Sequence, residues 1–358
     1  MAWCKSKAEY APYDEPFVPG PKNGHWSHRD PNPILEADEK AAEDGMAWAW
    51  GFGRDISVDE FKKNILSFSF AAPEGCPEPG RDIEIEYLKA PVRDGTELGL
   101  KVYRGKTTVD GGATLVFRMH GGGWVVGCHE TEEPENRILS AMKNVVVVSV
   151  DYRMAPEHPF PTAPNDCFDV LKWCKANADR LGINPGKIIL VGCSAGANLA
   201  AVLAIKAKEE GFTGIIGQHL AIPVTCHPRL FSKVPNHDSY ELLSYVQNKD
   251  AALVDARRME VFWDLYTGLN PQADVQHSPL LCSDLGGLPP ALIQVAGLDP
   301  LRDEGIAYGE ALKAAGVEVE TVVYAGLPHG FSGFVRIPES KEYYDKLVAF
   351  VRKLVGDA

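Results

Sequence analysis

Residues 187–200 read KIILVGCSAGANLA, an apolar segment followed at once by a run of small residues. Positions 188–191 are four consecutive aliphatic residues, a pattern typical of a strand that is buried on both faces of a sheet. Gly192 ends this segment, and the alanines that follow Ser194 favour a helix. The stretch therefore predicts a strand, a sharp turn that carries Ser194, and a helix.

This turn has the form Gly-x-Ser-x-Gly, with Gly192 and Gly196 on either side of the serine. Such a strand-to-helix turn holds its serine in a strained conformation and directs the hydroxyl outward at the carboxyl edge of the sheet. The backbone N–H of Ala195 is left free at the start of the helix. An ordinary helix N-cap is the alternative for this serine. Cys193 as a nucleophile is less favoured, since it lies one residue away from the apex.

The rest of the chain alternates apolar strand patterns with helical ones. Two alternating segments, residues 83–91 and 97–105, are expected to form half-buried antiparallel strands at the start of the sheet. Because helical patterns separate the later apolar runs, we expect an α/β protein with a mostly parallel, eight-stranded sheet. The later strands are expected at residues 113–119, 145–150, 187–192, 214–222, 291–297 and 317–324, and the helices at 133–142, 166–181, 194–210, 303–315 and 340–354.

Two parts of the chain fall outside this alternation. Residues 1–75 begin as a Pro-, Gly- and His-containing arm and continue as two helix-like segments rich in aromatic residues, which we interpret as cap helices. Residues 223–271 are too long for an ordinary crossover and are interpreted as a second cap insertion. The core is then expected to comprise residues 76–222 and 272–358.

A serine hydroxyl needs a general base that is oriented by an acid before it can act as a nucleophile. His329 follows the last predicted strand in the segment GLPHGF and is the preferred base. Asp299 follows the preceding strand and is the preferred acid. Asp303 is the rival acid, although its position at the start of a helix suits a carboxylate that interacts with the helix dipole.

A glycine-rich loop, residues 118–127 (RMHGGGWVVG), follows the strand at 113–119. Its unobstructed N–H groups at Gly122 and Gly123, together with that of Ala195, are expected to form an oxyanion hole worth about 3 kcal/mol per donor. His120 is expected to brace this loop through hydrogen bonds. Trp124 is a candidate wall of the substrate pocket, although core packing is the commoner fate of a tryptophan.

Composition narrows the possible functions further. The chain of 358 residues has a formal charge of −13 and no block rich in lysine and arginine, which disfavours nucleic acid as a partner. No apolar segment has the length of a membrane span, and the N-terminus has no signal-peptide pattern. Eight scattered cysteines without a CxxC pair favour a reducing, cytoplasmic location. No dinucleotide, ATP or metal motif is complete, so we expect neither a cofactor nor a metal ion.

Five segments in order, HGGGW, DYRMAPEHPFP, GCSAGANLA, DPLRDEG and HGF, resemble the hormone-sensitive-lipase-like group of α/β-hydrolase esterases. The resemblance extends from about Ile83 to the C-terminus, and it implies an α/β-hydrolase fold with a helical cap. It also implies a nucleophile, an acid and a base at Ser194, Asp299 and His329, and an oxyanion loop that includes His120, Gly121, Gly122 and Gly123. The DYRMAPEHPFP segment is implied to be a structural brace that uses Asp151, Tyr152, Arg153 and Glu157.

One position departs from the family. The family usually carries Asp or Thr before the nucleophile, whereas this chain has Cys193, which accepts hydrogen bonds poorly. We therefore expect the support behind the turn to differ from that in other members.

The sequence as a whole predicts a serine carboxylesterase that hydrolyses short-to-medium acyl esters through an acyl-enzyme. A thioesterase or amidase with the same triad, for example one that releases carrier-bound acyl chains, is the first alternative. A ligand receptor on a hydrolase fold is the second, because plant gibberellin receptors resemble this family and have lost the catalytic histidine. The expected partner is a small ester, and the sequence leaves a homodimer open.

Overall fold

The structure is a computed structural model that describes residues 34–37, 40, 57–65, 71–106 and 112–356. The predicted arm, residues 1–33, lies outside the described residues, as does most of the aromatic part of the first predicted cap segment. Residues 34–37 are helical, and helix α2 (Val58–Ile65) follows.

Eight strands form a single sheet. They are β1 (Ile83–Pro91), β2 (Glu97–Gly105), β3 (Ala113–Met119), β4 (Val145–Val150), β5 (Ile183–Cys193), β6 (Ile215–Ala221), β7 (Ala291–Leu298) and β8 (Val319–Pro328). Their spatial order is β1-β2-β4-β3-β5-β6-β7-β8. β2 is antiparallel to both β1 and β4, and the remaining neighbours are parallel. The prediction of an eight-stranded, mostly parallel sheet that begins with two antiparallel strands is confirmed.

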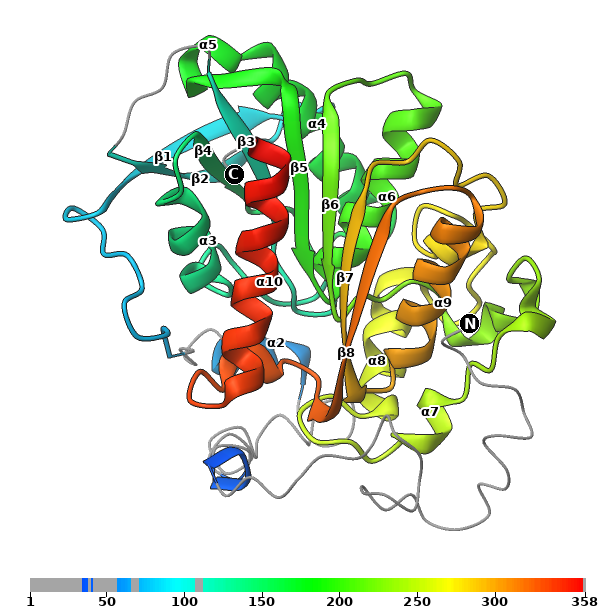
Figure 1. Ribbon diagram of the computed structural model, residues 1–358. Coiled ribbons are helices and arrows are strands. Elements are labelled where there is room, and N and C mark those ends of the chain that lie inside the picture. The colour runs from blue at the N-terminus through cyan, green and yellow to red at the C-terminus, as the bar shows by residue number, and fades with distance from the viewer. Residues whose placement is uncertain (1–33, 38–39, 41–56, 66–70, 107–111, 357–358) are drawn as a thin grey trace.

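Helices cover both faces of this sheet (Figure 1). The helices of the core are α3 (Glu133–Ser140), α4 (Thr162–Ala176), α5 (Ala178–Leu181), α6 (Ala195–Glu209), α9 (Arg302–Ala314) and α10 (Pro338–Val355). In Figure 1, α3 and α10 lie in front of the sheet, and α4 and α6 lie behind it. The prediction of one helix over residues 166–181 is wrong. The region forms two helices, because α4 ends before Asn177, whose backbone is not helical (φ −108°, ψ 30°) and whose side-chain amide donates to the carbonyl oxygen of Trp173 (2.8 Å).

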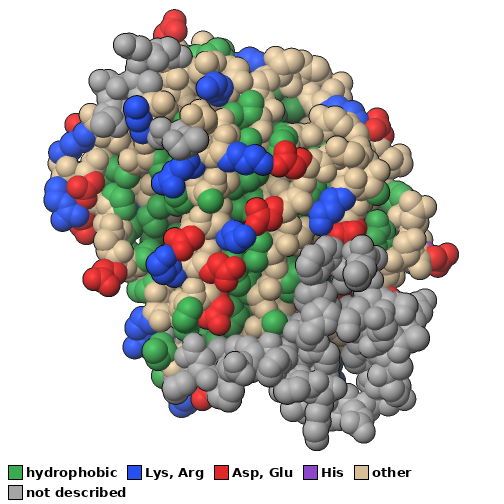
Figure 2. Space-filling model, in the orientation of Figure 1, with side chains coloured by type: hydrophobic (Ala, Val, Ile, Leu, Met, Phe, Trp, Pro, Cys, Tyr) green, Lys and Arg blue, Asp and Glu red, His purple; other side chains and the backbone are tan. Residues whose placement is uncertain are grey.

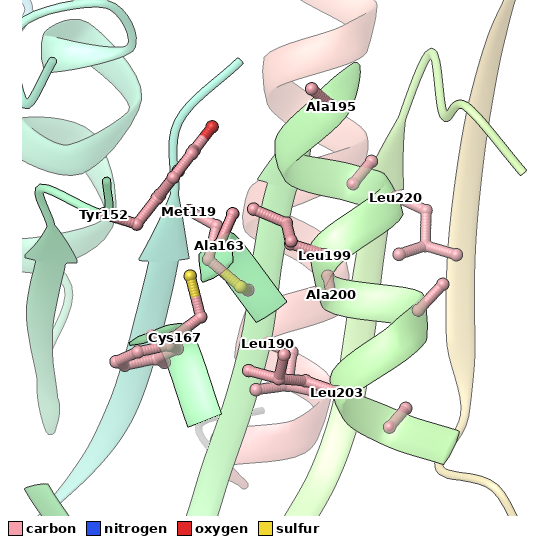
Figure 3. Close-up of a cluster of buried hydrophobic side chains, with 14 of the residues drawn as sticks. Met119, Tyr152, Ala163, Cys167, Leu190, Ala195, Leu199, Ala200, Leu203 and Leu220 are labelled. Atoms are coloured by element: carbon pink, nitrogen blue, oxygen red, sulfur yellow. The ribbon is translucent and has the colours of Figure 1, made fainter. Parts of the chain in front are cut away.

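Successive side chains of the central strands point to opposite faces and supply two separate cores. In β3, Val116 packs in a cluster with Leu347 and Val351 of α10. Its neighbours Leu115 and Phe117 belong to the larger cluster on the other face. Figure 3 shows part of this larger cluster, in which small and aliphatic side chains of α6 lie close to side chains of the strands. The α6 residues are Ala195, Leu199, Ala200 and Leu203, and the strand residues are Met119, Leu190 and Leu220.

Four strands bring the predicted functional segments to one edge of the sheet. The glycine loop follows β3, the Ser194 turn follows β5, Asp299 follows β7, and His329 follows β8. Because β3, β5, β6, β7 and β8 are parallel neighbours, their carboxyl ends meet at the same edge. In Figure 1 this edge is the lower end of the sheet, and α2 lies at the same end of the molecule.

The segment interpreted as a cap insertion contains short helices and no described strand. Its elements are η4 (Pro228–Lys233), η5 (His237–Ser239), α7 (Ser244–Gln247) and α8 (Ala256–Thr267). Two further 3-10 helices, η6 (Pro279–Leu281) and η7 (Phe331–Gly333), precede β7 and follow β8.

The face of the molecule that carries α10 has mixed charge. Figure 2 shows acidic and basic side chains interspersed over this face. Several of them form exposed ion pairs, such as Lys341 with Asp345 and Lys346 with Glu320. Within the described residues, no helix has both the length and the apolar character that crossing a membrane requires.

Candidate active site

The turn that carries Ser194 is fixed by lack of space. A Cβ atom on Gly192 would lie 2.1 Å from the carbonyl oxygen of Gly196, and one on Gly196 would lie 2.1 Å from the carbonyl oxygen of Met119. No side chain tolerates such distances to backbone atoms. Only glycine at both positions therefore lets α6 start this close to the ends of β3 and β5.

Ser194 itself has a strained backbone. Its φ of 54° and ψ of −116° are rare for a residue other than glycine and cost on the order of 1–3 kcal/mol. Three hydrogen bonds hold this conformation. The Ser194 N–H donates to the carbonyl oxygen of Ala221 (2.8 Å), and the Ser194 carbonyl oxygen accepts from the N–H groups of Asn198 (3.0 Å) and Val224 (3.5 Å). The serine is therefore locked in place before any substrate binds.

The side chains of Ser194, His329 and Asp299 form a continuous hydrogen-bonded chain. His329 Nε2 lies 3.0 Å from Ser194 Oγ, and His329 Nδ1 lies 2.7 Å from Asp299 Oδ2. A carboxylate only accepts hydrogen bonds, so Nδ1 carries the hydrogen and Nε2 presents a lone pair to the serine hydroxyl. The other oxygen of Asp299 accepts from the N–H of Leu301 (2.9 Å), which fixes the carboxylate. All three residues are buried, and Ser194 and His329 retain 7% and 8% exposure.

Asp303, the rival acid, has a different environment. Its Oδ2 accepts from the N–H groups of Leu243 and Ser244 (2.9 and 2.8 Å), and its Oδ1 pairs with Arg302 Nε (2.7 Å). These contacts attach the segment before α7 to the start of α9. The structure therefore brings Asp299, and not Asp303, to the imidazole of His329.

The glycine loop after β3 is held by side chains from other parts of the chain. Tyr152 Oη donates to the carbonyl oxygen of His120 (2.8 Å), and its ring stacks on the His120 ring with 4.2 Å between centroids. His120 Nδ1 donates to the carbonyl oxygen of Gly121 (2.8 Å). The N–H of Gly121 donates to Glu132 Oε1 (3.0 Å). Sequence patterns did not single out Glu132, since nothing in its local sequence indicates that it reaches the loop.

Burial lowers the pKa of His120 to about 4, so the ring is neutral near pH 7. A neutral ring with Nδ1 committed to Gly121 suits a brace better than a proton carrier.

Three backbone N–H groups remain free beside the serine. Among the described residues, none accepts a hydrogen bond from the N–H of Gly122, Gly123 or Ala195. The carbonyl oxygen of Gly122, by contrast, accepts from the N–H groups of Val125 and Val126 (3.1 and 3.0 Å). Amide donors inside a protein are rarely left unpaired, which makes these N–H groups candidates to bind a developing negative charge.

Trp124, the candidate pocket residue, is fully buried in an aromatic cluster. Its ring stacks on Tyr266 of α8 at 4.3 Å and an interplanar angle of 7°, and it contacts Trp263 at 4.6 Å. Helix α8 also approaches the glycine loop, because a Cβ on Gly123 would lie 2.4 Å from the ring of Phe262. Trp124 thus links the loop to α8, and the Phe262 ring lies against Gly123, a contact that sequence patterns did not identify.

The predicted brace segment makes long-range contacts. Besides the bond from Tyr152, Arg153 pairs with Asp166 (2.7 Å) and Asp94 (2.6 Å), and Glu157 pairs with Lys62 of α2 (2.5 Å). These contacts connect the segment to α4, to the turn between β1 and β2, and to α2.

Cys193 ends β5 directly before the nucleophile position. Burial raises the pKa of its thiol well above the usual value, and the nearby Glu132 and Glu135 act in the same direction. In the described part of the chain, Sγ of Cys193 makes no hydrogen bond. A buried ion pair between Arg118 and Glu135 (2.6 Å) lies near this thiol, and its carboxylate also accepts from Tyr343 Oη (2.8 Å).

A search of the described residues finds no group of three or more His, Cys, Asp or Glu side chains that could hold a metal ion.

Comparison with known proteins places this geometry in a family. A model of the alpha/beta hydrolase fold matches residues 116–333, which contain the glycine loop, the serine turn, Asp299 and His329. The chain therefore belongs to the α/β-hydrolase family, and the resemblance to its hormone-sensitive-lipase-like esterases is confirmed.

Individual relatives agree with this placement. The esterase LipI of Mycobacterium tuberculosis is 37% identical over 245 residues, 67% of this chain and 72% of its own length. The carboxylesterase NlhH of the same species is 35% identical over 272 residues, 74% of this chain and 79% of its own. The structure of a hyperthermophilic esterase from the archaeon Pyrobaculum calidifontis superposes with a TM-score of 0.74 at 32% identity, covering 90% of this chain and 98% of that one.

Proposed function

We propose that the protein is a serine carboxylesterase in which Ser194 is the nucleophile, His329 the general base and Asp299 the orienting acid. The main support for this proposal is the position of the His329 imidazole, whose Nε2 lies 3.0 Å from Ser194 Oγ and whose Nδ1 lies 2.7 Å from Asp299 Oδ2. The chain is a carboxylic ester hydrolase, since it is 35% and 37% identical to named esterases over most of its length. The assignment of roles to individual residues is the part that we propose.

In the acylation step, Ser194 Oγ attacks the ester carbonyl carbon while its proton passes to His329 Nε2. Asp299 stabilises the imidazolium that results. The carbonyl oxygen becomes an oxyanion, which the N–H groups of Gly122, Gly123 and Ala195 are positioned to bind. Collapse of the tetrahedral intermediate breaks the bond to the leaving alkoxide, which takes the proton from His329 and departs as an alcohol.

Deacylation repeats these steps with water. His329 Nε2 accepts a proton from the water molecule as the water oxygen attacks the acyl carbon, and the same N–H donors bind the second oxyanion. Collapse of this intermediate releases the carboxylic acid, and Ser194 Oγ recovers its proton from His329. Every proton transfer uses the one imidazole, and the reaction needs no cofactor.

We further propose that the substrates are esters of short-to-medium acyl groups and that helix α2, within the N-terminal region of residues 1–75, and residues 223–271 contribute to a cap over the site. Support for the cap comes from contacts: Phe61 of α2 lies 6.0 Å from Phe262 of α8, and the Phe262 ring packs against Gly123. Aromatic rings this close to the oxyanion donors favour small apolar groups at that position.

Thioester and amide substrates are the alternative within the same chemistry, because the triad and oxyanion donors suit any acyl transfer. The receptor alternative is disfavoured by the hydrogen-bonded imidazole of His329. Rates on an oxygen ester, a thioester and an amide that share one acyl group separate these alternatives. Free cysteines, seven in the described residues, are compatible with the proposed cytoplasmic location.

The test is Ser194→Ala, compared with Cys193→Ala as a matched control that removes the neighbouring thiol. We expect Ser194→Ala to lower kcat for p-nitrophenyl butyrate by about 10⁴-fold or more, because the nucleophile is lost while the oxyanion donors remain. Cys193→Ala should retain turnover. Thermal unfolding should show that both variants fold. The assignment is contradicted if Ser194→Ala still hydrolyses the ester. It is also contradicted if Cys193→Ala folds and loses activity while Ser194→Ala stays active.

A further inference from the structure

Glu132 is a buried acid outside the proposed triad, and it contacts the loop that carries the oxyanion donors. The residue directly precedes α3 and is only 8% exposed. Its Oε1 accepts the N–H of Gly121 at 3.0 Å, and a Cβ built on Gly121 would lie 3.1 Å from the same oxygen. Gly121 immediately precedes Gly122, the first of the proposed oxyanion donors.

The surroundings of Glu132 make a carboxylate costly at this position. Burial raises the pKa of Glu132 to about 7, although Arg118 opposes this shift, and Glu135 adds to it. The Arg118 guanidinium is already paired with Glu135 (2.6 Å). Among the described residues, Oε2 of Glu132 has no hydrogen-bond partner, so the bond to Gly121 is the polar contact made by this side chain. Burying an acid is costly, so the one hydrogen bond that Glu132 makes points to the role of this residue.

The other restraints at this point act on the carbonyl groups of the loop. The carbonyl oxygens of His120, Gly121 and Gly122 accept hydrogen bonds from Tyr152, from the His120 ring and from the N–H groups at 125 and 126. On the donor side of the same three residues, the Gly121 N–H is tied to Glu132, and the Gly122 N–H is free. The Gly122 N–H belongs to the peptide group between Gly121 and Gly122. This group therefore directly follows the N–H that Glu132 binds.

We propose that Glu132 is a positioning residue that aligns the oxyanion donors by holding the Gly121 N–H, an inference that rests on the proposed esterase function. What matters is the acceptor oxygen and not the charge. Near neutral pH both forms of the carboxyl are present, and the protonated form still offers a carbonyl oxygen to the amide. The amide of glutamine also offers a carbonyl oxygen, so glutamine should replace Glu132 in this role.

Three variants test this role: Glu132→Ala, Glu132→Gln and the control Glu130→Gln. Glu130 lies two residues away, but its carboxylate pairs with Lys101 (2.8 Å) instead of the loop. We expect Glu132→Ala to lower kcat for p-nitrophenyl acetate about 10- to 100-fold with KM nearly unchanged, because a displaced donor weakens binding of the transition state alone. The kcat of Glu132→Gln should stay within about threefold of the wild-type value. The kcat of Glu130→Gln should equal the wild-type value.

A transition-state probe separates positioning from general damage. Ser194 Oγ adds to the carbonyl carbon of an aliphatic trifluoromethyl ketone, its proton passes to His329, and the ketone oxygen becomes an oxyanion in the hole. The inhibition constant should rise in Glu132→Ala by the same factor by which kcat/KM falls, and inhibition by the product alcohol should not change. Thermal unfolding of each variant reports on folding separately.

An unchanged kcat and inhibition constant in Glu132→Ala would overturn the inference. The inference would also be overturned if Glu132→Gln lost as much kcat as Glu132→Ala, since the charge and not the acceptor oxygen would then matter. If Glu132→Ala does not fold, the Glu132→Gln comparison still decides. Failure of the proposed function is distinct, because it shows as activity in Ser194→Ala whatever happens at Glu132.

Discussion

The serine turn and the glycine loop lie side by side at one sheet edge, and both are rich in glycine, yet they are held in different ways. The turn is fixed by contacts within a few residues and with the neighbouring strand, because a Cβ at Gly192 or Gly196 would lie 2.1 Å from a carbonyl oxygen. The loop is fixed by one hydrogen bond that Tyr152 donates and one that Glu132 accepts, and these residues lie 32 and 11 positions from their partners. One part of the site is therefore defined by steric exclusion and the other by polar contacts from distant elements.

The largest effect is expected where space is the restraint. In Gly196→Ala, the added methyl group would meet the carbonyl oxygen of Met119 at 2.1 Å and that of His120 at 2.6 Å. Backbone atoms at the end of β3 cannot move apart without separating β3 from β5, so we expect loss of the folded protein. Circular dichroism and the yield of folded protein measure this. Gly286→Ala is the control, because its methyl group would meet nothing closer than 3.5 Å.

If Gly196→Ala folds and unfolds at the temperature of the wild type, the turn is not held by exclusion, and the contrast between the two regions disappears. A folded but inactive variant would instead mean that α6 can shift slightly away from the strand, at the expense of the serine position.

This contrast also explains what the sequence could predict. Strand, turn and helix around Ser194 follow from local pattern, as do the strand ends that carry Asp299 and His329, and the sheet agrees with the expected strands. The choice of Asp299 over Asp303 rested on the same local reading, and the hydrogen bond to His329 Nδ1 agrees with it.

Contacts that depend on packing between distant elements could not be predicted. Nothing near Glu132 in the sequence indicates that its carboxyl reaches Gly121, and nothing near Phe262 places its ring against Gly123. Trp124 was a candidate pocket wall by position, and only the packing of α8 reveals its stacking on Tyr266. The division of the region after residue 161 into α4 and α5 depends on Asn177, whose side-chain amide donates to the carbonyl oxygen of Trp173, and the helical pattern alone does not show that the helix ends there.

Among polar contacts, the largest effect is expected at Asp299, the proposed acid. Asp299→Asn should lower kcat by about 10³- to 10⁴-fold, because an amide favours the wrong tautomer of His329 and cannot stabilise the imidazolium. Asp303→Asn is the matched variant, and its effect should fall on stability, since Oδ2 accepts the N–H groups of Leu243 and Ser244. Steady-state kinetics and thermal unfolding of both variants separate the two roles. A larger loss of kcat in folded Asp303→Asn than in Asp299→Asn contradicts the assignment.

The smallest effect is expected for a single hydrogen bond to the loop. Tyr152→Phe removes the bond from Oη to the carbonyl oxygen of His120 but keeps a ring that can stack on the imidazole at 4.2 Å. A buried carbonyl left without its donor costs about 1–3 kcal/mol of stability. Since Glu132 and the His120 ring still hold Gly121, we expect kcat to fall by only about 3- to 10-fold, because the loop shifts less than when Gly121 is released.

Combining Tyr152→Phe with Glu132→Ala turns this difference into a test of how the loop is held. The His120 carbonyl and the Gly121 N–H belong to one peptide group, so losing the second bond should cost more once the first is gone. The double variant should then lose more activity than the product of the two single losses. Independent, multiplicative losses would mean that the two bonds do not share the restraint of this peptide. Tyr152→Leu is the necessary companion, because it removes the ring as well. If stacking carries the restraint, this variant should lose far more activity than Tyr152→Phe, and the hydrogen bond from Tyr152 would then be the minor contact.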